Sequence, residues 1–340
     1  MSEPTQNNPA KSLPSVSICI PALNEIENLP SLLTFVREEH EAGLPVVEVL
    51  VDCSGSTDGS FRFLEKYSTT WTLVRPIDTT MRDGLAASIN RMIHRSEGVV
   101  IVRMDADLSI PRGVLGELVR RLAKSGNGLI GPRIEPRPEG HSFAERISLA
   151  LYAVQECLSS HTPRTTNLQV FFKAGVTVPV DAESEDSAIQ DAVARAGGRL
   201  EYARDLAAYV TPPRITKEYL SQRVRCASQV RWYAEHFSPS GRIATQSPGQ
   251  ILPAVADVAR SRRVPLFDLS CFLLLELLVQ LGVRTTGLKL VLVTRFGTSR
   301  VFFEEDDGSF PGSGLPDRRA PKRWALSRAH DAAFPCVARR

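Results

Sequence analysis

The stretch Val99-Val-Ile-Val-Arg-Met-Asp-Ala-Asp-Leu-Ser-Ile-Pro111 decides how the rest of the chain is interpreted. Its first four residues are apolar, which is typical of a parallel strand, because helices cover both faces of a parallel sheet. Asp105 and Asp107 follow at the carboxyl end of this predicted strand, where open α/β sheets bind ligands. Alternate residues of an extended segment face one side, so both carboxylates can reach one Mg²⁺ or Mn²⁺ ion. The alternative is that Asp107 or Ser109 caps a helix beginning at Pro111.

Length and composition describe an ordinary folded protein. The chain has 340 residues, 43% of them hydrophobic and 23% charged, which is enough for one large or two small domains. A formal net charge of +3 gives no support for nucleic-acid binding. The six cysteines lack paired spacing, so we expect neither a disulfide framework nor a zinc site, and a cytoplasmic location fits best.

Three segments differ from the rest in composition. Residues 1–14 are polar and lack the apolar core of a signal peptide, so we expect a disordered lead-in. Residues 238–253 and 304–321 are rich in Gly, Pro, Ser or charge, which indicates connectors. The end of the chain, within 304–340, is basic and is expected to be disordered; contact with an anionic partner or lipid surface is the alternative.

The most apolar stretch, residues 266–281, is too short to span a bilayer because Asp268, Glu276 and Gln280 interrupt it. These residues differ by multiples of four, so they form one stripe on a helix that is otherwise rich in Leu and Phe. The pattern predicts a buried core helix or an oligomer contact, such as a homodimer through 266–281. Peripheral membrane contact is the alternative, and the acidic stripe argues against it.

Strand and helix patterns alternate along the first third of the chain, as in a parallel sheet with crossover helices. The predicted elements are strands at 16–20, 46–51 and 71–74, helices at 29–41 and 84–94, and a short helix capped by Thr57 or Asp58. Successive β/α units therefore bring their loops to one edge of the sheet.

Polar residues follow the first two predicted strands. Pro21-Ala-Leu-Asn-Glu25 offers an amide and a carboxylate. Asp52 lies at the same level after the second strand, where a carboxylate can accept a hydrogen bond from a base N–H or a ribose hydroxyl. Asn24 and Glu25 also suit an ordinary helix start, because Asn caps helices and acids favour the first turn. These residues alone leave both interpretations open.

An ordered set of motifs resembles the family 2 glycosyltransferases. The set consists of Pro21-Ala-Leu-Asn-Glu25, Val51-Asp-Cys-Ser-Gly-Ser-Thr-Asp-Gly59, Gly84-Leu-Ala-Ala-Ser-Ile-Asn90, Asp105-Ala-Asp107 and Glu185-Asp186. Each fragment is weak alone, and their order and spacing carry the resemblance. It covers about residues 15 to 235 and implies the GT-A fold, a Rossmann-like α/β fold whose mostly parallel sheet is flanked by helices. A helical C-terminal extension at 236–303 and the tail at 304–340 would follow.

The resemblance also implies roles for single residues. Asp105 and Asp107 would contact the metal ion and the ribose or diphosphate of a nucleotide-diphosphate sugar, and Asp186 would be the general base of an inverting displacement. The structural alternative is that Glu185 and Asp186 merely favour a helix N-terminus. The other donor-binding residues that we expect are Pro21, Leu23, Asn24, Glu25, Asp52, Gly84 and Asn90.

Gln222, Arg223 and Arg225 lie on a predicted helix after Pro212-Pro213. The guanidinium fork of Arg suits a diphosphate, so we expect one of these residues to hold the leaving group. A solvated helix face is the alternative.

Three departures from the family pattern bear on the function. Cys53-Ser54 stands where the family has an acid, and Asp83 stands where it usually has lysine. Cys226 occupies the position at which processive synthases carry tryptophan. The sequence therefore predicts a soluble, non-processive transferase with a small-molecule or lipid-linked acceptor. The alternatives are a catalytically inactive binding or scaffold protein and a sugar nucleotidyltransferase.

Overall fold

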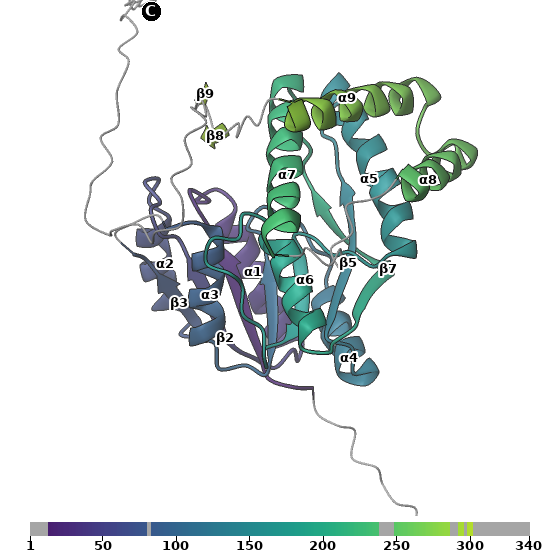
Figure 1. The fold of residues 1–340 in the computed structure, drawn as a ribbon. Helices are drawn as coiled ribbons and strands as arrows, with labels where there is room; N and C mark the ends of the chain where they lie inside the picture. The colour runs from purple at the N-terminus through teal and green to yellow at the C-terminus, as the bar shows by residue number, and fades with distance from the viewer. Residues whose placement is uncertain (1–12, 80–82, 238–247, 286–291, 296–297, 302–340) are drawn as a thin grey trace, which may run out of the picture. The chain divides into compact units, whose positions relative to one another are not determined.

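The computed structural model describes residues 13–79, 83–237, 248–285, 292–295 and 298–301, all within a compact unit that spans residues 1–304 (Figure 1). The expected lead-in before residue 13 and the expected tail at 304–340 lie outside these residues. In chain order the elements are β1 (Val16–Pro21), α1 (Leu29–Glu41), β2 (Val46–Asp52), α2 (Ser60–Ser68), β3 (Val74–Ile77), α3 (Leu85–Arg95), β4 (Val100–Met104), α4 (Val114–Ser125), β5 (Leu129–Pro136), α5 (Phe143–His161), β6 (Leu168–Phe172), α6 (Glu185–Arg195), β7 (Leu200–Val210), α7 (Thr216–Phe237), α8 (Pro248–Ser261), α9 (Leu266–Thr285), β8 (Leu292–Arg295) and β9 (Thr298–Val301).

The central sheet has seven strands in the order β3-β2-β1-β4-β6-β5-β7. Strands β1 to β4 are parallel, β6 runs antiparallel to β4 and β5, and β7 is parallel to β5. The sheet grows from β1 toward β2 on one side and toward β4 on the other. Ligands of open α/β sheets bind at such a reversal, outside the carboxyl ends of the strands. The mostly parallel α/β fold expected from the sequence is confirmed.

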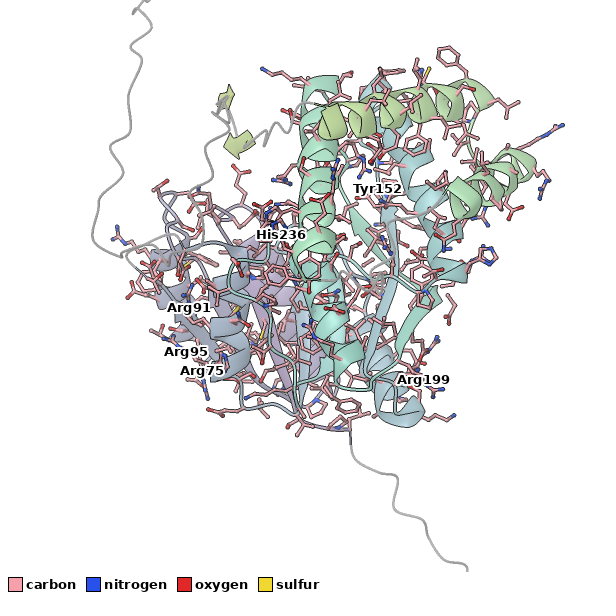
Figure 2. All side chains as sticks on the ribbon, viewed as in Figure 1. Arg75, Arg91, Arg95, Tyr152, Arg199 and His236 are labelled. Carbon is pink, nitrogen blue, oxygen red and sulfur yellow. The ribbon has the colours of Figure 1, made fainter. Side chains whose placement is uncertain are left out.

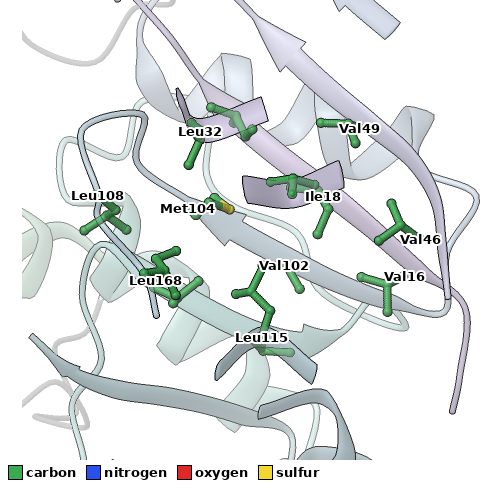
Figure 3. Close-up of a cluster of buried hydrophobic side chains, with 14 of the residues drawn as sticks. Val16, Ile18, Leu32, Val46, Val49, Val102, Met104, Leu108, Leu115 and Leu168 are labelled. Atoms are coloured by element: carbon green, nitrogen blue, oxygen red, sulfur yellow. The ribbon is translucent and has the colours of Figure 1, made fainter. Parts of the chain in front are cut away.

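Alternating side chains of β4 enter two different hydrophobic cores. Val102 and Met104 belong to the larger core, which Leu115 of α4 also enters (Figure 3). Ile101 belongs to the core on the other face, together with residues of α3 and α6. Side chains two residues apart in a strand share a face. Arg103 therefore points to the side of the sheet that α6 covers.

Three predicted boundaries are wrong. The third strand is Val74–Ile77 rather than 71–74, because the backbone N–H of Trp71 donates to the Tyr67 carbonyl and closes the end of α2. Val99 is 55% exposed and precedes β4. Helix α4 begins at Val114 rather than at Pro111.

The alternative role of Asp107 or Ser109 as a helix cap is therefore also wrong. Gly113, with φ of +82°, is the residue before α4. Its N–H and that of Gly116 donate to the buried Glu39 carboxylate. A buried carboxylate at this N-terminus satisfies free amides and opposes the helix dipole. Asp107 is thus not needed to begin α4.

The C-terminal helices pack on the rest of the unit. Helix α8 contacts α5, and α9 contacts both α5 and α7 (Figure 1). Residues 248–253 were expected to be part of a connector but begin α8, because Ala254 and Val258 provide an apolar face that packs in the core shared with α5. Strands β8 and β9 form an antiparallel pair. Among the described residues, no helix has the length and apolarity needed to cross a bilayer.

Candidate active site

A large groove lies along the carboxyl edge of the sheet. Its lining includes Asn24, Asp107 and Asp186 from the loops after β1 and β4 and from α6, together with residues of α5 and α7. Its volume of about 3480 Å³ exceeds the roughly 300–1,000 Å³ of a pocket for one small molecule. The groove therefore has room for a donor and an acceptor together.

A single arginine gathers three carboxylates at the floor of this groove. The side chain of Arg103, in β4, is 1% exposed. Its Nη1 donates to Asp186 Oδ1 at 2.9 Å, and its Nη2 donates to Glu185 Oε1 at 3.1 Å. Nη2 also lies 2.8 Å from Asp105 Oδ1. The acid after β4 and the acid pair of α6 are thus connected through one guanidinium.

The burial of Arg103 makes this arrangement energetically important. Its Nε is buried without a hydrogen-bond partner among the described residues. Burial opposes the charged guanidinium, but the charges of Asp105, Asp186 and Glu185 raise the pKa of Arg103 overall. Removing one partner from a buried ion pair typically costs about 3–5 kcal/mol, because the other charge stays buried and unpaired. The cluster must therefore form as a unit.

Asp105 is held on its other side by Asn167. Its backbone N–H donates to the Asn167 carbonyl at 2.9 Å, and its Oδ2 accepts from Asn167 Nδ2 at 2.8 Å. Asn167 has φ of +59°, a left-handed conformation that Asn tolerates better than most residues. Both oxygens of Asp105 therefore have a fixed direction.

Asp107 is the more accessible of the two aspartates. Partial burial and the charge of Asp105 raise the pKa of the Asp107 carboxyl above its usual range. The side chain nevertheless keeps exposed surface and lines the groove. It can therefore reach an ion in the groove.

Asp105 and Asp107 fit a divalent ion that a substrate completes. Mg²⁺ is usually held by one or two carboxylates together with substrate phosphates. Each carboxylate oxygen has a second lone pair, so the existing contacts of Asp105 leave it able to bind an ion. Within the described part of the chain, no cluster of three His, Cys, Asp or Glu side chains could hold an ion alone. The site thus fits an ion that arrives with a phosphate-bearing donor.

Glu185 and Asp186 form the first turn of α6. Burial raises the pKa of both carboxyls, and the charge of Arg103 opposes this increase. Gln169 and Gln190 each donate to the backbone carbonyl of Asp186, at 3.2 and 2.8 Å. Both the side chain and the backbone of Asp186 are therefore fixed, and its raised pKa suits a group that accepts a proton near neutral pH.

The loop after β1 is braced by the loop after β2. Asn24 has φ of +58°, and its Oδ1 accepts from the Thr57 N–H at 2.7 Å. Leu23, Asn24 and Glu25 all line the groove. Burial raises the pKa of Glu25, a hydrogen bond from Asn28 opposes this, and the charges of Asp107 and Asp105 add to the increase. Glu25 thus lies close to the aspartate pair.

The structure gives Asp52 a contact that the sequence did not predict. Its Oδ2 accepts from Nε of Arg91, which is labelled in Figure 2, at 2.8 Å. Its Oδ1 accepts from the backbone N–H and the hydroxyl of Ser54. The buried Cys53 makes backbone and thiol hydrogen bonds to the Ile77 carbonyl. Asp52 is absent from the groove lining, so its expected contact with the donor needs a rearrangement around Arg91.

The side-chain amide of Asn90 binds backbone groups of the protein and not the groove. Its Nδ2 donates to the Val178 carbonyl at 2.6 Å, and its Oδ1 accepts from the Val178 N–H at 3.1 Å. Both polar atoms are therefore committed to a buried backbone segment. These contacts favour structural support, and the expected role of Asn90 in donor binding stays a prediction. Pro21 ends β1 outside the groove lining, whereas Gly84 lies within it.

The expected diphosphate-binding residues of α7 divide into two kinds. Gln222 and Arg225 are exposed and line the groove, and the charge of Arg225 is close enough to lower the pKa of Glu185. Arg223 also lines the groove but makes a bidentate pair with Glu276 of α9, at 3.0 and 3.1 Å. The charge of Arg223 is thus already balanced by Glu276, which favours Arg225 and Gln222 over Arg223 as the residues that hold a diphosphate. Tyr152 of α5, which is labelled in Figure 2, also belongs to the lining of this groove.

The sequence interpretation missed the residues that hold the acids in place, namely Arg103, Asn167, Gln169 and Gln190. One signal was available: an arginine inside an apolar strand is buried, and buried charges are almost always paired. Its position two residues before Asp105 also placed both side chains on one face. No comparable signal marked Asn167 or the two glutamines.

Comparisons with known proteins agree with this architecture. The model of the family described as Glycosyl transferase family 2 matches residues 17–186, half of the chain. Glycosyltransferase AglE of Haloferax volcanii is 30% identical over 162 residues, which are 47% of this chain and 53% of that protein. A prophage bactoprenol glucosyl transferase homolog of Escherichia coli is 24% identical over 125 residues, 37% of this chain and 41% of that protein. The match thus spans about half the length of these curated relatives.

A solved structure shows the same fold. Mannosyltransferase PcManGT from Pyrobaculum calidifontis, in complex with GDP-Man and Mn²⁺, superposes with a TM-score of 0.56 at 20% identity. The likeness covers 80% of this chain and 88% of that one. With the family match over half of its length and a GT-A fold, the chain belongs to glycosyltransferase family 2.

Proposed function

We propose that the chain is an inverting glycosyltransferase that moves a sugar from a nucleotide-diphosphate sugar to a small-molecule or lipid-linked acceptor. The observation that carries this proposal is the Arg103 cluster. It brings Asp105, which can face a donor phosphate, together with Asp186, which can accept a proton from the acceptor. Both groups line one groove.

The donor end of the site has residues suited to a diphosphate. Asp105 and Asp107 would hold Mg²⁺ or Mn²⁺, which supplies positive charge to the diphosphate as it leaves. The PcManGT structure contains GDP-Man and Mn²⁺, which supports this choice of ligands. Arg225 and Gln222 are exposed on the same groove and can donate hydrogen bonds to phosphate oxygens. Leu23, Asn24 and Gly84 are further donor contacts in this proposal.

At the acceptor end, Asp186 takes the proton of the attacking hydroxyl or amine. The acceptor atom forms a bond to the anomeric carbon as the bond from that carbon to the diphosphate oxygen breaks. The proton ends on Asp186 and the electron pair on the leaving diphosphate, so the transfer is balanced. Arg103 positions the Asp186 carboxylate for this step and does not itself touch the reacting atoms.

The acceptor and the compartment are finer points of the proposal. The name of the Escherichia coli relative includes bactoprenol, a lipid, which favours a lipid-linked acceptor. Five cysteines within the described residues are free thiols, which fits the reducing cytoplasm.

A ligand-stabilisation experiment tests the donor part of the proposal. We expect a nucleotide-diphosphate sugar, in a panel carrying different bases and sugars, to raise the melting temperature in the presence of Mn²⁺ or Mg²⁺ and much less in EDTA. A ligand at 100 times its Kd adds about 2.7 kcal/mol of stability. No stabilisation by any donor with either metal would contradict the proposal and favour an inactive binding or scaffold protein.

A further inference from the structure

Two ion pairs fix the rotation of α9 about its axis. Asp268, which is 4% exposed, accepts from Arg146 of α5 at 3.1 Å. Glu276 accepts from Arg223 of α7 at 3.0 and 3.1 Å. Gln280 donates to Glu276 at 3.0 Å. The polar stripe predicted from the sequence therefore faces the protein.

The opposite side of α9 is apolar and exposed. Five of its residues, here named the α9 apolar face, are each between 55% and 67% exposed: Leu266, Phe267, Leu274, Leu277 and Leu278. Among the side chains described in this helix, the only charged ones are Asp268 and Glu276, and both point inward. Single exposed leucines are common, but a contiguous apolar patch marks an interaction surface. The expectation of a buried core helix is therefore wrong for half of this helix.

Three arginines come shortly before the α9 apolar face in the chain. Arg260, Arg262 and Arg263 precede α9, and all three are exposed. Arg260 and Arg263 each pair with one acid, whereas Arg262 has no ion pair among the residues that the structure describes. An apolar face bordered by basic residues is typical of a helix that lies on an anionic membrane. A second copy placed symmetrically on this face would instead bring like charges together.

The α9 apolar face continues into the groove of the candidate active site. Leu273, Leu277 and Leu281 line the groove that also contains Asp105 and Asp186. Leu277 belongs to both surfaces. A lipid tail along these leucines would remain in an apolar environment while its polar end reached the acids.

We propose that the α9 apolar face docks on the surface of an anionic lipid bilayer and that the groove opens at the membrane to take a lipid-linked acceptor. The docking depends only on the α9 apolar face and on Arg260, Arg262 and Arg263, which precede α9. The identity of the acceptor rests on the proposed function.

Vesicle co-sedimentation of the full chain tests the docking. We expect the protein to sediment with vesicles of phosphatidylcholine and phosphatidylglycerol and to bind weakly to phosphatidylcholine alone. The double variant Leu274→Gln/Leu278→Gln should lower the partition coefficient at least about tenfold, because two leucines lose their apolar environment. Arg262→Gln should lower it about fivefold, the effect of roughly one basic residue at an anionic surface. Val99→Gln, at an equally exposed apolar residue before β4, should have no effect.

Three outcomes would overturn the docking. The first is wild-type protein that stays in the supernatant with both kinds of vesicle. The second is a leucine double variant that melts well below the wild type, because its leucines would then be covered by the chain itself. The third is a wild-type dimer without vesicle binding that the double variant converts to monomer, which would assign the face to a second copy. The vesicle assay contains no donor and therefore tests the docking alone. If a separate assay with donor and acceptor showed no sugar transfer while the protein still bound vesicles, only the proposed function would be refuted.

Discussion

Replacing Arg103 by Met should expose how the candidate site is held together. The substitution keeps most of the side-chain volume but removes the positive charge that faces Asp105, Glu185 and Asp186. Three carboxylates then lie close together without their cation. Breaking a buried ion pair costs about 3–5 kcal/mol. For a unit of this size we expect the melting temperature to fall by roughly 6–15 °C.

The matched control is Arg37→Met. Arg37 pairs with Glu41 four residues later in α1, and both side chains are largely exposed. Surface pairs of this kind contribute about 0–1 kcal/mol, so this variant should melt close to the wild type. Arg103→Lys should lie between the two, because one ammonium cannot replace a guanidinium with contacts to three acids. The melting temperatures are measured by scanning calorimetry. If Arg103→Met melted at the same temperature as Arg37→Met, Arg103 would not hold the three carboxylates in place.

The stability deficit of Arg103→Met should also depend on pH. The pKa values of Glu185 and Asp186 are raised in the folded chain, so their contribution to stability is present below their unfolded pKa of about 4 and is lost as pH rises through the folded values. The charge of Arg103 limits this loss because it lowers both pKa values. The deficit of the variant should therefore be largest above the folded pKa values and shrink toward about pH 4. A deficit that is constant with pH would show that Arg103 acts through packing alone.

Three further substitutions separate binding from support. Asp107→Asn should abolish the Mn²⁺-dependent stabilisation by donor. It should not lower the melting temperature of the free protein, because the pKa of the Asp107 carboxyl is raised in the folded chain. A variant that still responds to Mn²⁺ and donor would remove Asp107 from the metal site. Asn90→Ala should lower the free energy of unfolding, measured in urea, by about 1–3 kcal/mol, since the buried N–H and carbonyl of Val178 lose their partner. The Kd of this variant for the donor should stay at the wild-type value. A large increase in that Kd would show that Asn90 binds the donor. Arg225→Gln should raise the donor Kd about tenfold in calorimetry, the effect of one charge-assisted hydrogen bond, whereas an unchanged Kd would leave Arg225 as a solvated residue.

Local patterns were sufficient for the order of the elements from β1 to β4 and for one half of the candidate site. The apolar run before Asp105 predicts a buried strand, and the position of the two aspartates after it follows directly. The partners of Arg103 could not be found in this way, because Glu185 and Asp186 lie 82 and 83 residues further along the chain. Asn90 is separated from Val178 by 88 residues. Contacts of this length depend on the register of the sheet and on the position of α6.

Helix α9 shows a different limit. Periodicity correctly predicted one polar stripe on an apolar helix, but it cannot say which side faces the protein. That choice depends on Arg146 and Arg223, which are 122 and 53 residues away from their partners in α9. The inward side carries both kinds of contact: Leu269, Phe272 and Val279 are buried there, and the two ion pairs with other helices lie on the same side.

The central claim is that Asp186 is the base of a sugar transfer from a donor held at the aspartate pair. It is tested most directly by comparing Asp186→Asn with wild type in two measurements on the same samples: the Kd of a stabilising nucleotide sugar with Mn²⁺, and the release of nucleoside diphosphate in the presence of acceptors. We expect a Kd within a few-fold of wild type and a rate lower by about 10²–10⁴, the usual contribution of general base catalysis. Wild-type turnover by Asp186→Asn would contradict it.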